Sequence, residues 1–454
     1  MFLFLYAGPV KPKSKSNKLT EGSVLKHLFA LTLPMIVGIT ANMSFNLVDT
    51  YFIGKLGADQ LTAISFSFPV VLTILNLSIG IAIGTNSVLS RMLGENKDDD
   101  VHALSSYIVI LGSFLALAIA GLGILTIEPL FTLIGAQKVH LPYIEDYMIY
   151  AYIAMAFRMI SISVSGTYRA HGITLIPSIA ILITATFNLI LDPLLIFGYG
   201  ILPELGIKGA GIATMLANFL AMCFELGLAK YKYHFFGSLK GEVFKRKWSE
   251  LLNIVLPAST ANALNPIALN VINYFVSLQS ADKVAGVGVA TKIQFFSMIP
   301  ILALSAAIGP VVGQNFGAQK NERVSETLKY IFMFSLSWGL LQFVVLFLGA
   351  DFFASFFTDD QNIISHSTEY LNYIAPSLFG YNLVILICSG LNALNYPRSS
   401  FVLIFLRSLG LFILLYYIFR VLGLDEHVLS AIACANVLTG IFSIFFAKQK
   451  FKFS

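Results

Sequence analysis

The sequence has little charge. Asp, Glu, Lys and Arg make up 12% of its 454 residues, whereas they make up about a quarter of a typical soluble domain. Hydrophobic residues account for 57%, and the mean hydropathy is +0.80. The apolar runs recur at about 20 residues, the length that crosses a bilayer as a helix. One very large soluble core would not require this repeated length, so we predict a polytopic membrane protein.

Cysteine is also scarce. Cys223, Cys388 and Cys434 lie in apolar segments and lack the spacing of metal ligands or of a disulfide framework. We expect small buried side chains at these positions, no metal and no cofactor. Residues 1–6 have no basic flank and are too short for the apolar core of a signal peptide, so we expect no cleavable signal.

Twelve apolar segments are predicted to span the membrane. Lipid offers no hydrogen bonds to the backbone, and these segments are too long and too uniformly apolar for the strands of a barrel. The predicted class is therefore an all-α polytopic membrane protein. The expected helices cover residues 26–53, 62–90, 103–127, 142–166, 173–199, 209–230, 250–278, 284–313, 327–349, 366–391, 399–421 and 427–447.

Lys and Arg concentrate on one side of the predicted membrane. They gather in residues 11–26, 230–247 and 448–452 and in short loops on the same side. The opposite side carries only Lys55, Lys138, Lys208, Lys283 and Arg420. Basic loops stay inside the cell, so both termini are expected in the cytoplasm. The net charge of +5 follows this distribution and does not indicate a nucleic-acid partner.

The two halves of the chain match each other at an offset of 223 residues. Matching pairs include Leu33-Pro34 with Leu256-Pro257, Tyr51-Phe52 with Tyr274-Phe275, and Gly94 with Gly317. We predict two lobes, residues 19–236 and 237–454, each with six helices and related by an axis along the membrane normal. Two such pseudo-symmetric lobes around a central cleft are typical of transporters that work by alternating access.

One position breaks the repeat. Asp49 falls on Ile272, so only the first half carries a carboxylate there. Asp192 is predicted at a similar depth in the same lobe, with Asn188 one helical turn before it and Pro193 directly after it. A low dielectric and a like-charged neighbour both favour a protonated carboxyl group. The two aspartates and the amide therefore predict a proton or sodium site.

Alternative interpretations remain for these residues. Asp49 would also fit a role as a hydrogen-bonding group at a helix end near Thr50. Pro34 is predicted to bend the first helix, either as a hinge that responds to Asp49 or as a static kink, which its match with Pro257 favours. For Lys292 and Arg407 we expect snorkelling or a backbone carbonyl partner, and the partner of Arg158 stays open.

A set of aromatic and methionine side chains suits an apolar, cationic substrate. Any one of them also fits lipid contact or core packing, since the chain has 39 Phe. The candidates for a substrate surface are Met43, Phe45, Tyr147, Tyr150 and Met155.

Several motifs together resemble the multidrug and toxic compound extrusion (MATE) family over residues 19–450. The helix 1 aspartate with the Asn-x-x-x-Asp-Pro motif resembles its DinF-like bacterial branch. The motifs are Leu33-Pro34, the run Val48 to Gly57, Arg91 to Asn96, Arg169 to Gly172, Asn188 to Leu194, Gly209 to Thr214, and Gly313 to Gly317.

This resemblance implies a cation site formed by Asp49, Asn188, Asp192 and Thr214, with Pro34 as the helix bend. Phe45 departs from related archaeal members, which have Tyr there, so one hydroxyl is missing. The sodium-coupled branch has acidic residues in helices 7 and 10, and this chain has none in those apolar spans. The C-lobe sodium site of that branch is therefore not expected.

We predict an antiporter of the bacterial inner membrane that exports amphipathic, often cationic, organic compounds in exchange for protons. It is expected to act as a monomer among membrane lipids. Sodium coupling is one alternative, and a lipid-linked oligosaccharide flippase is a second. The flippase would need a cationic cleft, to which Arg158, Lys292 and Arg407 are the possible contributors. An intramembrane enzyme is not expected, because His, Cys and carboxylate motifs beside polar loops are lacking.

Overall fold

The structure is a computed structural model that describes residues 19–200, 203–423 and 427–451, without the side chains of residues 45–50 and 281. The first half contains α2 (Val24–Gly54), α3 (Ala58–Gly94), α4 (Asp98–Leu125), α5 (Ile127–Leu133), α6 (Leu141–Ala170), α7 (Leu175–Ile196) and α8 (Ile207–Tyr231). The second half contains α9 (Gly241–Ser277), α10 (Ala281–Ser297), α11 (Ile299–Gly317), α12 (Asn321–Ser355), α13 (Gln361–Ile374), η1 (Ala375–Ser377), α14 (Leu378–Ala393), α15 (Pro397–Phe405), η2 (Leu406–Gly410), α16 (Leu411–Val421) and α17 (His427–Lys450).

The all-α membrane architecture is confirmed. Each predicted span contains helix, and the bounds differ from the prediction by up to about a helical turn or two. Among the described residues, 11 helical segments are long and apolar enough to cross a membrane. The long helix α9 is not one of them, because Ser, Thr and Asn side chains recur along it.

Three predicted spans are interrupted, which the hydropathy pattern did not show. The span at 284–313 is divided between α10 and α11 at Met298, just before Pro300. The span at 366–391 contains the 3₁₀ turn η1, which includes Pro376. Proline has no N–H to donate to the preceding turn, so both breaks follow from the sequence locally. The third interruption is the π-helical turn η2, and the short helix α5 is an addition.

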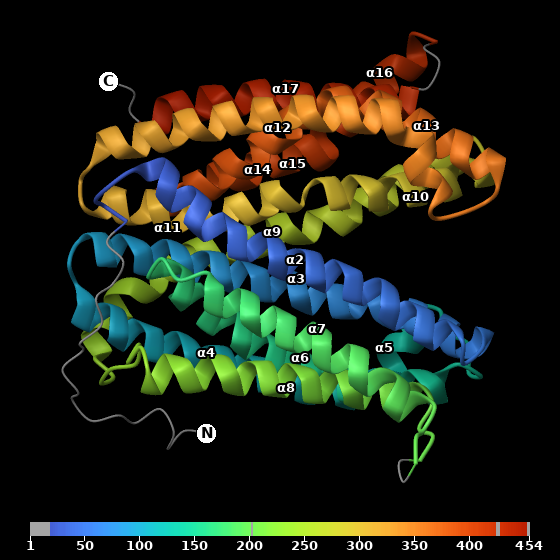
Figure 1. Cartoon of the computed structure of the whole chain (residues 1–454), viewed down its shortest axis with the longest axis horizontal. Coiled ribbons are helices and arrows are strands. Elements are labelled where there is room, and N and C mark those ends of the chain that lie inside the picture. The colour runs from blue at the N-terminus through green and yellow to red at the C-terminus, as the bar shows by residue number, and fades with distance from the viewer. Residues whose placement is uncertain (1–18, 201–202, 424–426, 452–454) are drawn as a thin grey trace.

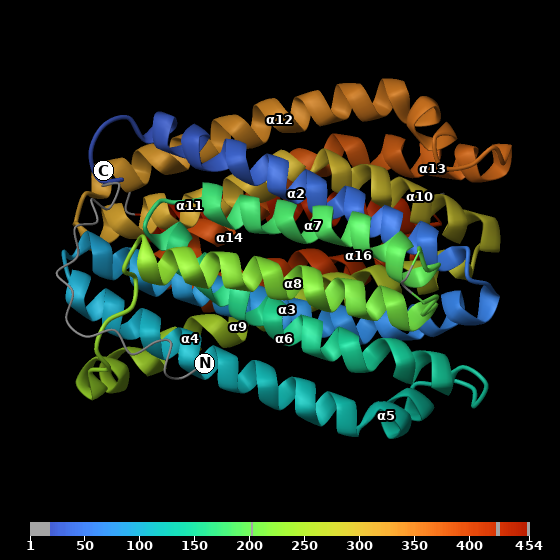
Figure 2. The same cartoon turned by 60° about the horizontal axis from the view of Figure 1, so that its bottom comes forward.

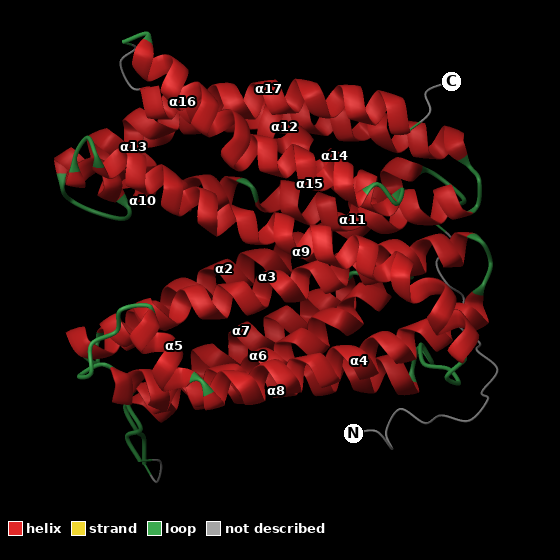
Figure 3. Cartoon of the chain, turned by 180° about the vertical axis from the view of Figure 1, so that it is seen from behind, coloured by secondary structure: helices red, strands yellow, loops and turns green. Residues whose placement is uncertain are grey.

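The helices form two groups that follow the two halves of the chain. Figure 1 shows α3–α8 in blue to green on one side and α10–α17 in yellow to red on the other, with α2 and α9 between them. The first part of α2 packs in the core of the second group, and the first part of α9 packs in the core of the first group. All the long helices run along one axis of the molecule (Figure 2). Seen from behind, the two groups lie close at one end and diverge toward the end that carries α5, α10 and α13 (Figure 3). The predicted boundary at residue 236 falls in the connection between α8 and α9.

The groups meet through glycines near the C-terminal ends of α3 and α11. A Cβ at Gly94 would lie 2.2 Å from the carbonyl oxygen of Gln314, and one at Gly317 would lie 2.1 Å from that of Arg91. These helix ends are related by the repeat, so the same motif packs against its own copy. The Gln314 amide also donates to the Ala170 carbonyl at 2.8 Å. Two of the motifs in the sequence thus serve contact between the lobes.

We expect Gly317→Val to destabilise the protein by about 1–3 kcal/mol, because a side chain there collides with backbone rather than with a movable side chain. Melting of the purified protein in detergent measures this. Gly121→Ala is the matched control, since a Cβ at Gly121 in α4 meets nothing within 4 Å. Equal melting temperatures for the two variants would show that the helix ends are loosely packed.

Candidate functional site

Two polar residues of the predicted site lie on one face of α7. Asn188 and Asp192 are one turn apart, and both side chains are 0% exposed. Most of the other residues of this helix are apolar, so its polar positions turn toward the neighbouring helices rather than toward lipid. The sequence-based placement of the amide and the carboxylate on one helical face is therefore confirmed.

The helix α8 brings Thr214 to this face. Asn188 donates through Nδ2 to the Thr214 hydroxyl at 3.0 Å. The helix α8 approaches α7 and α6 closely because Gly209 and Gly211 have no side chain at the points of contact. A Cβ at Gly209 would lie 2.2 Å from the Leu195 carbonyl oxygen, and one at Gly211 would lie 3.0 Å from that of Tyr147. The glycine motif before Thr214 thus positions its hydroxyl.

Asp49 belongs to the C-terminal part of α2. The side chains of Asp49 and Phe45 lie outside the described residues, although α2 itself is described from Val24 to Gly54. This helix packs along α7, and Gly38 allows contact there, since its Cβ would lie 3.2 Å from Ser178. Pro34 is half-buried within α2, which continues as helix through it.

The predicted substrate side chains have different surroundings. Tyr147 and Met155 are partly buried against the core of the first lobe. Tyr150 on α6 has the Lys208 ammonium 5.8 Å from its ring centroid. Met43 on α2 is half-buried. Tyr147 and Met155 therefore fit the core-packing alternative. Tyr150 lies on α6 with them, and only Met43 lies on a helix of the polar site, α2.

Sequence reasoning missed a second buried carboxylate. Glu225 on α8 is 0% exposed and accepts hydrogen bonds from the hydroxyls of Ser161 and Ser165 on α6, the latter at 2.6 Å. Arg158 and Arg169 lie within electrostatic reach of it. Glu225 lies near the basic end of its predicted span, where a charged residue is expected to face water, so sequence reasoning did not single it out. The Ser-x-x-x-Ser spacing on α6, which places both hydroxyls on one face, was a usable signal.

The intramembrane arginines are held by asparagines. Arg158 donates to Asn42 Oδ1 at 3.4 Å. Arg407 donates to Asn265 Oδ1 at 3.2 Å and lies 3.9 Å from the centroid of the Tyr381 ring. The snorkelling or carbonyl-bound arrangement predicted for Arg407 is therefore wrong, because its cation is held by side chains within the lobe. Lys292 is exposed, in agreement with snorkelling.

His171, which follows α6, has a structural role. Its ring is buried, bonds the Thr167 carbonyl oxygen at 2.9 Å and stacks on Phe235 at 4.2 Å between centroids. Burial lowers the pKa of His171 to about 4, so the ring stays neutral at physiological pH. It therefore packs the motif Arg169 to Gly172 against the connection that follows α8.

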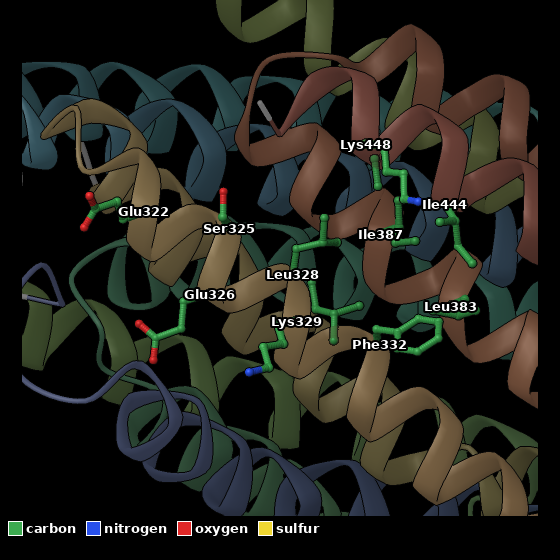
Figure 4. Close-up of a pocket in the computed structure, with 12 residues that line it drawn as sticks. Glu322, Ser325, Glu326, Leu328, Lys329, Phe332, Leu383, Ile387, Ile444 and Lys448 are labelled. Carbon is green, nitrogen blue, oxygen red and sulfur yellow. The ribbon is translucent and has the colours of Figure 1, made fainter. Parts of the chain in front are cut away.

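A cavity of about 730 Å³ lies away from these residues. It is formed by α12, α14 and α17 within the second lobe. Figure 4 shows Glu322 and Glu326 on one side of it, while Phe332, Leu383 and Ile444 gather on the other. Its walls are mainly apolar, and none of the predicted site residues lines it.

Two repeated helical lobes, with buried ionisable groups at the level of the membrane, define a secondary transporter. The family model described as MatE matches residues 34–194 and 257–418, one copy in each half. The chain belongs to the MATE family.

Relatives and solved structures agree with this membership. The chain is 33% identical over 93% of its length to a protein of Shewanella oneidensis described as an FAD transporter, and it covers 94% of that protein. It is 24% identical to the multidrug export protein MepA of Staphylococcus haemolyticus, with 92% of each chain covered. The Vibrio cholerae MATE transporter VcmN in its bent form superposes with a TM-score of 0.88 at 24% identity, over 96% of this chain and 98% of that one.

Proposed function

We propose that this MATE transporter exports organic compounds in exchange for protons, and that Asp49 and Asp192 carry the protons. The observation that supports this most is the buried cluster of Asp192, Asn188 and Thr214 in the first lobe. At the repeat offset Asn188 and Asp192 fall on Leu411 and Leu415. An ionisable side chain inside a membrane costs folding free energy, so its presence there indicates that the transport cycle uses it.

The contacts between lobes suggest which side is closed. The lobes meet at the ends that carry Arg91, Ala170 and Gly317, which positive-inside bias assigns to the cytoplasm. At the opposite ends the two groups of helices diverge (Figure 3). We infer an outward-open state. Protonation would let α2 bend near Pro34, and we expect α2 to be straighter at high pH than at low pH.

The test uses everted vesicles containing the purified protein. We expect ethidium uptake to be driven by an acid-inside pH gradient without sodium, because Phe45 supplies no oxygen ligand for a sodium ion. The gradients of pH and of sodium are applied separately. Uptake that needs sodium and ignores the pH gradient would overturn the proton assignment.

Ile272→Ala is the matched control for the repeat argument. It changes the position equivalent to Asp49 in the second lobe, where no carboxylate is present to titrate. We expect its pH-driven uptake to keep the proton coupling of the wild type. Loss of coupling as complete as in Asp49→Asn would show that the second lobe takes part in proton transfer.

A second candidate concerns the substrate. The MepA relatives are described as multidrug export proteins, which favours a drug as the substrate. The Shewanella relative is described as a transporter of FAD, which carries a pyrophosphate. Half-buried arginines that line cavities favour the anionic substrate. Arg158 and Arg169 line a cavity of about 130 Å³ in the first lobe, and Arg407 lines one in the second. Uptake of FAD and of ethidium by the same vesicles distinguishes the two.

A further inference from the structure

The second lobe contains a cavity of about 80 Å³ at the level of the proton site in the first lobe. Its lining includes Ile272, which matches Asp49 at the repeat offset, and Tyr370, which matches Tyr147. The two lobes therefore offer equivalent places with different chemistry. Since liquid water occupies about 30 Å³ per molecule, this cavity has room for one small group such as a phosphate.

Arg407 provides the positive charge of this cavity. Its Nη2 donates to Asn265 Oδ1 at 3.2 Å and to the Ser408 hydroxyl at 2.9 Å, and its guanidinium lies over the Tyr381 ring. These partners are neutral. No ion pair joins Arg407 to a carboxylate in the part of the chain that is described. The site thus keeps the positive charge of a half-buried guanidinium, which attracts an anion.

A local departure from the α-helix accompanies Arg407. It lies in the π-helical turn η2, between α15 and α16. The equivalent helix of the first lobe, α7, is α-helical throughout, and Thr184 occupies the matching position. Single π-helical turns are unfavourable and occur often at functional sites. The turn is therefore a feature of the second lobe's cavity rather than of the repeat.

The asparagine partner is common to both lobes. Asn42 and Asn265 are equivalent at the repeat offset, and each accepts a hydrogen bond from an arginine. In the first lobe that arginine is Arg158, which has Glu225 within electrostatic reach. In the second lobe it is Arg407, which comes from a different helix. In the first lobe the charge of Arg158 is balanced by the carboxylate of Glu225. In the second lobe Arg407 has no such carboxylate among the described ion pairs, so its charge is available to a bound anion.

A further donor faces the same cavity. The Gln294 side chain lines it, and its Oε1 accepts the Tyr370 hydroxyl at 3.0 Å. This contact fixes the amide, so that its NH₂ group remains a donor. A guanidinium, an amide NH₂ and an aromatic face are groups that recognise a phosphate attached to a planar ring system.

We propose that Arg407, Asn265 and Gln294 form a substrate subsite that binds an anionic phosphate group of the exported compound. The subsite rests on one part of the proposed function, namely that the protein is an exporter. The two lobes then have different roles. The carboxylates of the first lobe exchange protons, and the arginine of the second lobe binds the anionic end of the substrate. Uncharged or cationic compounds gain nothing from this subsite.

The experiment compares FAD with riboflavin, which has the same ring system and no phosphate. Binding to the purified protein is followed by flavin fluorescence in detergent without any gradient. We expect Arg407→Gln to weaken FAD binding at least about tenfold and to leave riboflavin binding unchanged. Arg398→Gln is the matched control, because Arg398 is exposed at the start of the same transmembrane segment.

Two results would overturn the subsite: FAD affinity of Arg407→Gln within twofold of the wild type, or wild-type protein that binds riboflavin as tightly as FAD. If Arg407→Gln fails to fold, a competition experiment on the wild-type protein tests the subsite instead. Inorganic pyrophosphate should displace FAD and leave riboflavin bound. Pyrophosphate that leaves FAD in place contradicts the proposal. FAD binding through Arg407 together with sodium-driven export would keep the subsite and reject the proton coupling.

Discussion

Asp49→Asn and Asp192→Asn should each abolish pH-driven export while the protein still folds and inserts. The amide keeps the volume and polarity of the carboxyl group but cannot gain or lose a proton. Asp192 is fully buried on the helical face where Asn188 bonds Thr214. A water-exposed carboxylate elsewhere therefore does not take over its proton in the variant. Ethidium uptake into everted vesicles with an acid interior measures the effect, and we expect it to fall to the level of protein-free vesicles.

Asp146→Asn is the control for this pair, because Asp146 is exposed at the outer end of α6 and should be neutral. Expression and melting of each variant confirm folding. Drug resistance at the wild-type level in cells that express Asp49→Asn or Asp192→Asn normally would remove these carboxylates from the coupling mechanism. Loss for one residue and not for the other would assign the proton to a single carboxylate.

Arg91→Ala should open the end of the molecule at which the lobes now meet. Arg91 on α3 is 5% exposed, pairs with Glu250 on α9 at 2.7 Å and donates to the Ala393 carbonyl at 2.6 Å. Removing one partner of a buried ion pair typically costs about 3–5 kcal/mol. Both contacts join the first half of the chain to the second. The cost of losing them therefore falls on the closed state and shifts the population toward the inward-open state.

Spin labels at Glu95 and Gln319, which are exposed near this contact, report the separation of the lobes in a background without Cys223 and Cys434. We expect a longer distance to dominate in Arg91→Ala. Arg246→Ala is the matched control: Arg246 also joins the two halves, to Asp100 at 2.7 Å, but its side chain is 56% exposed. Such pairs contribute at most about 1 kcal/mol. An unchanged distance distribution in Arg91→Ala would mean that the glycine contacts alone hold the lobes closed.

Much of the candidate site followed from local rules. Asn188 and Asp192 are one turn apart, so the helical period alone placed them on one face. Thr214 depended on the family resemblance, because the connection between α7 and α8 sets which residue of α8 meets Asn188. Glu225 was missed, since hydropathy does not show whether a carboxylate near a basic helix end turns to water or inward. Its serine partners on α6 decide that.

The sequence by itself determined the membrane class, the spans, the repeat and the lobe that carries the carboxylates, since each depends on composition, on helical period or on the comparison of one half with the other. Only the tertiary structure decided which residues of distant helices meet. Arg91 contacts Glu250 and Ala393, and Arg407 contacts Asn265 and Tyr381, because helices far apart in the chain pack side by side. The physical reason is that spacing within a helix is set by its own geometry, whereas the partner of a buried charge is set by the packing of the whole fold.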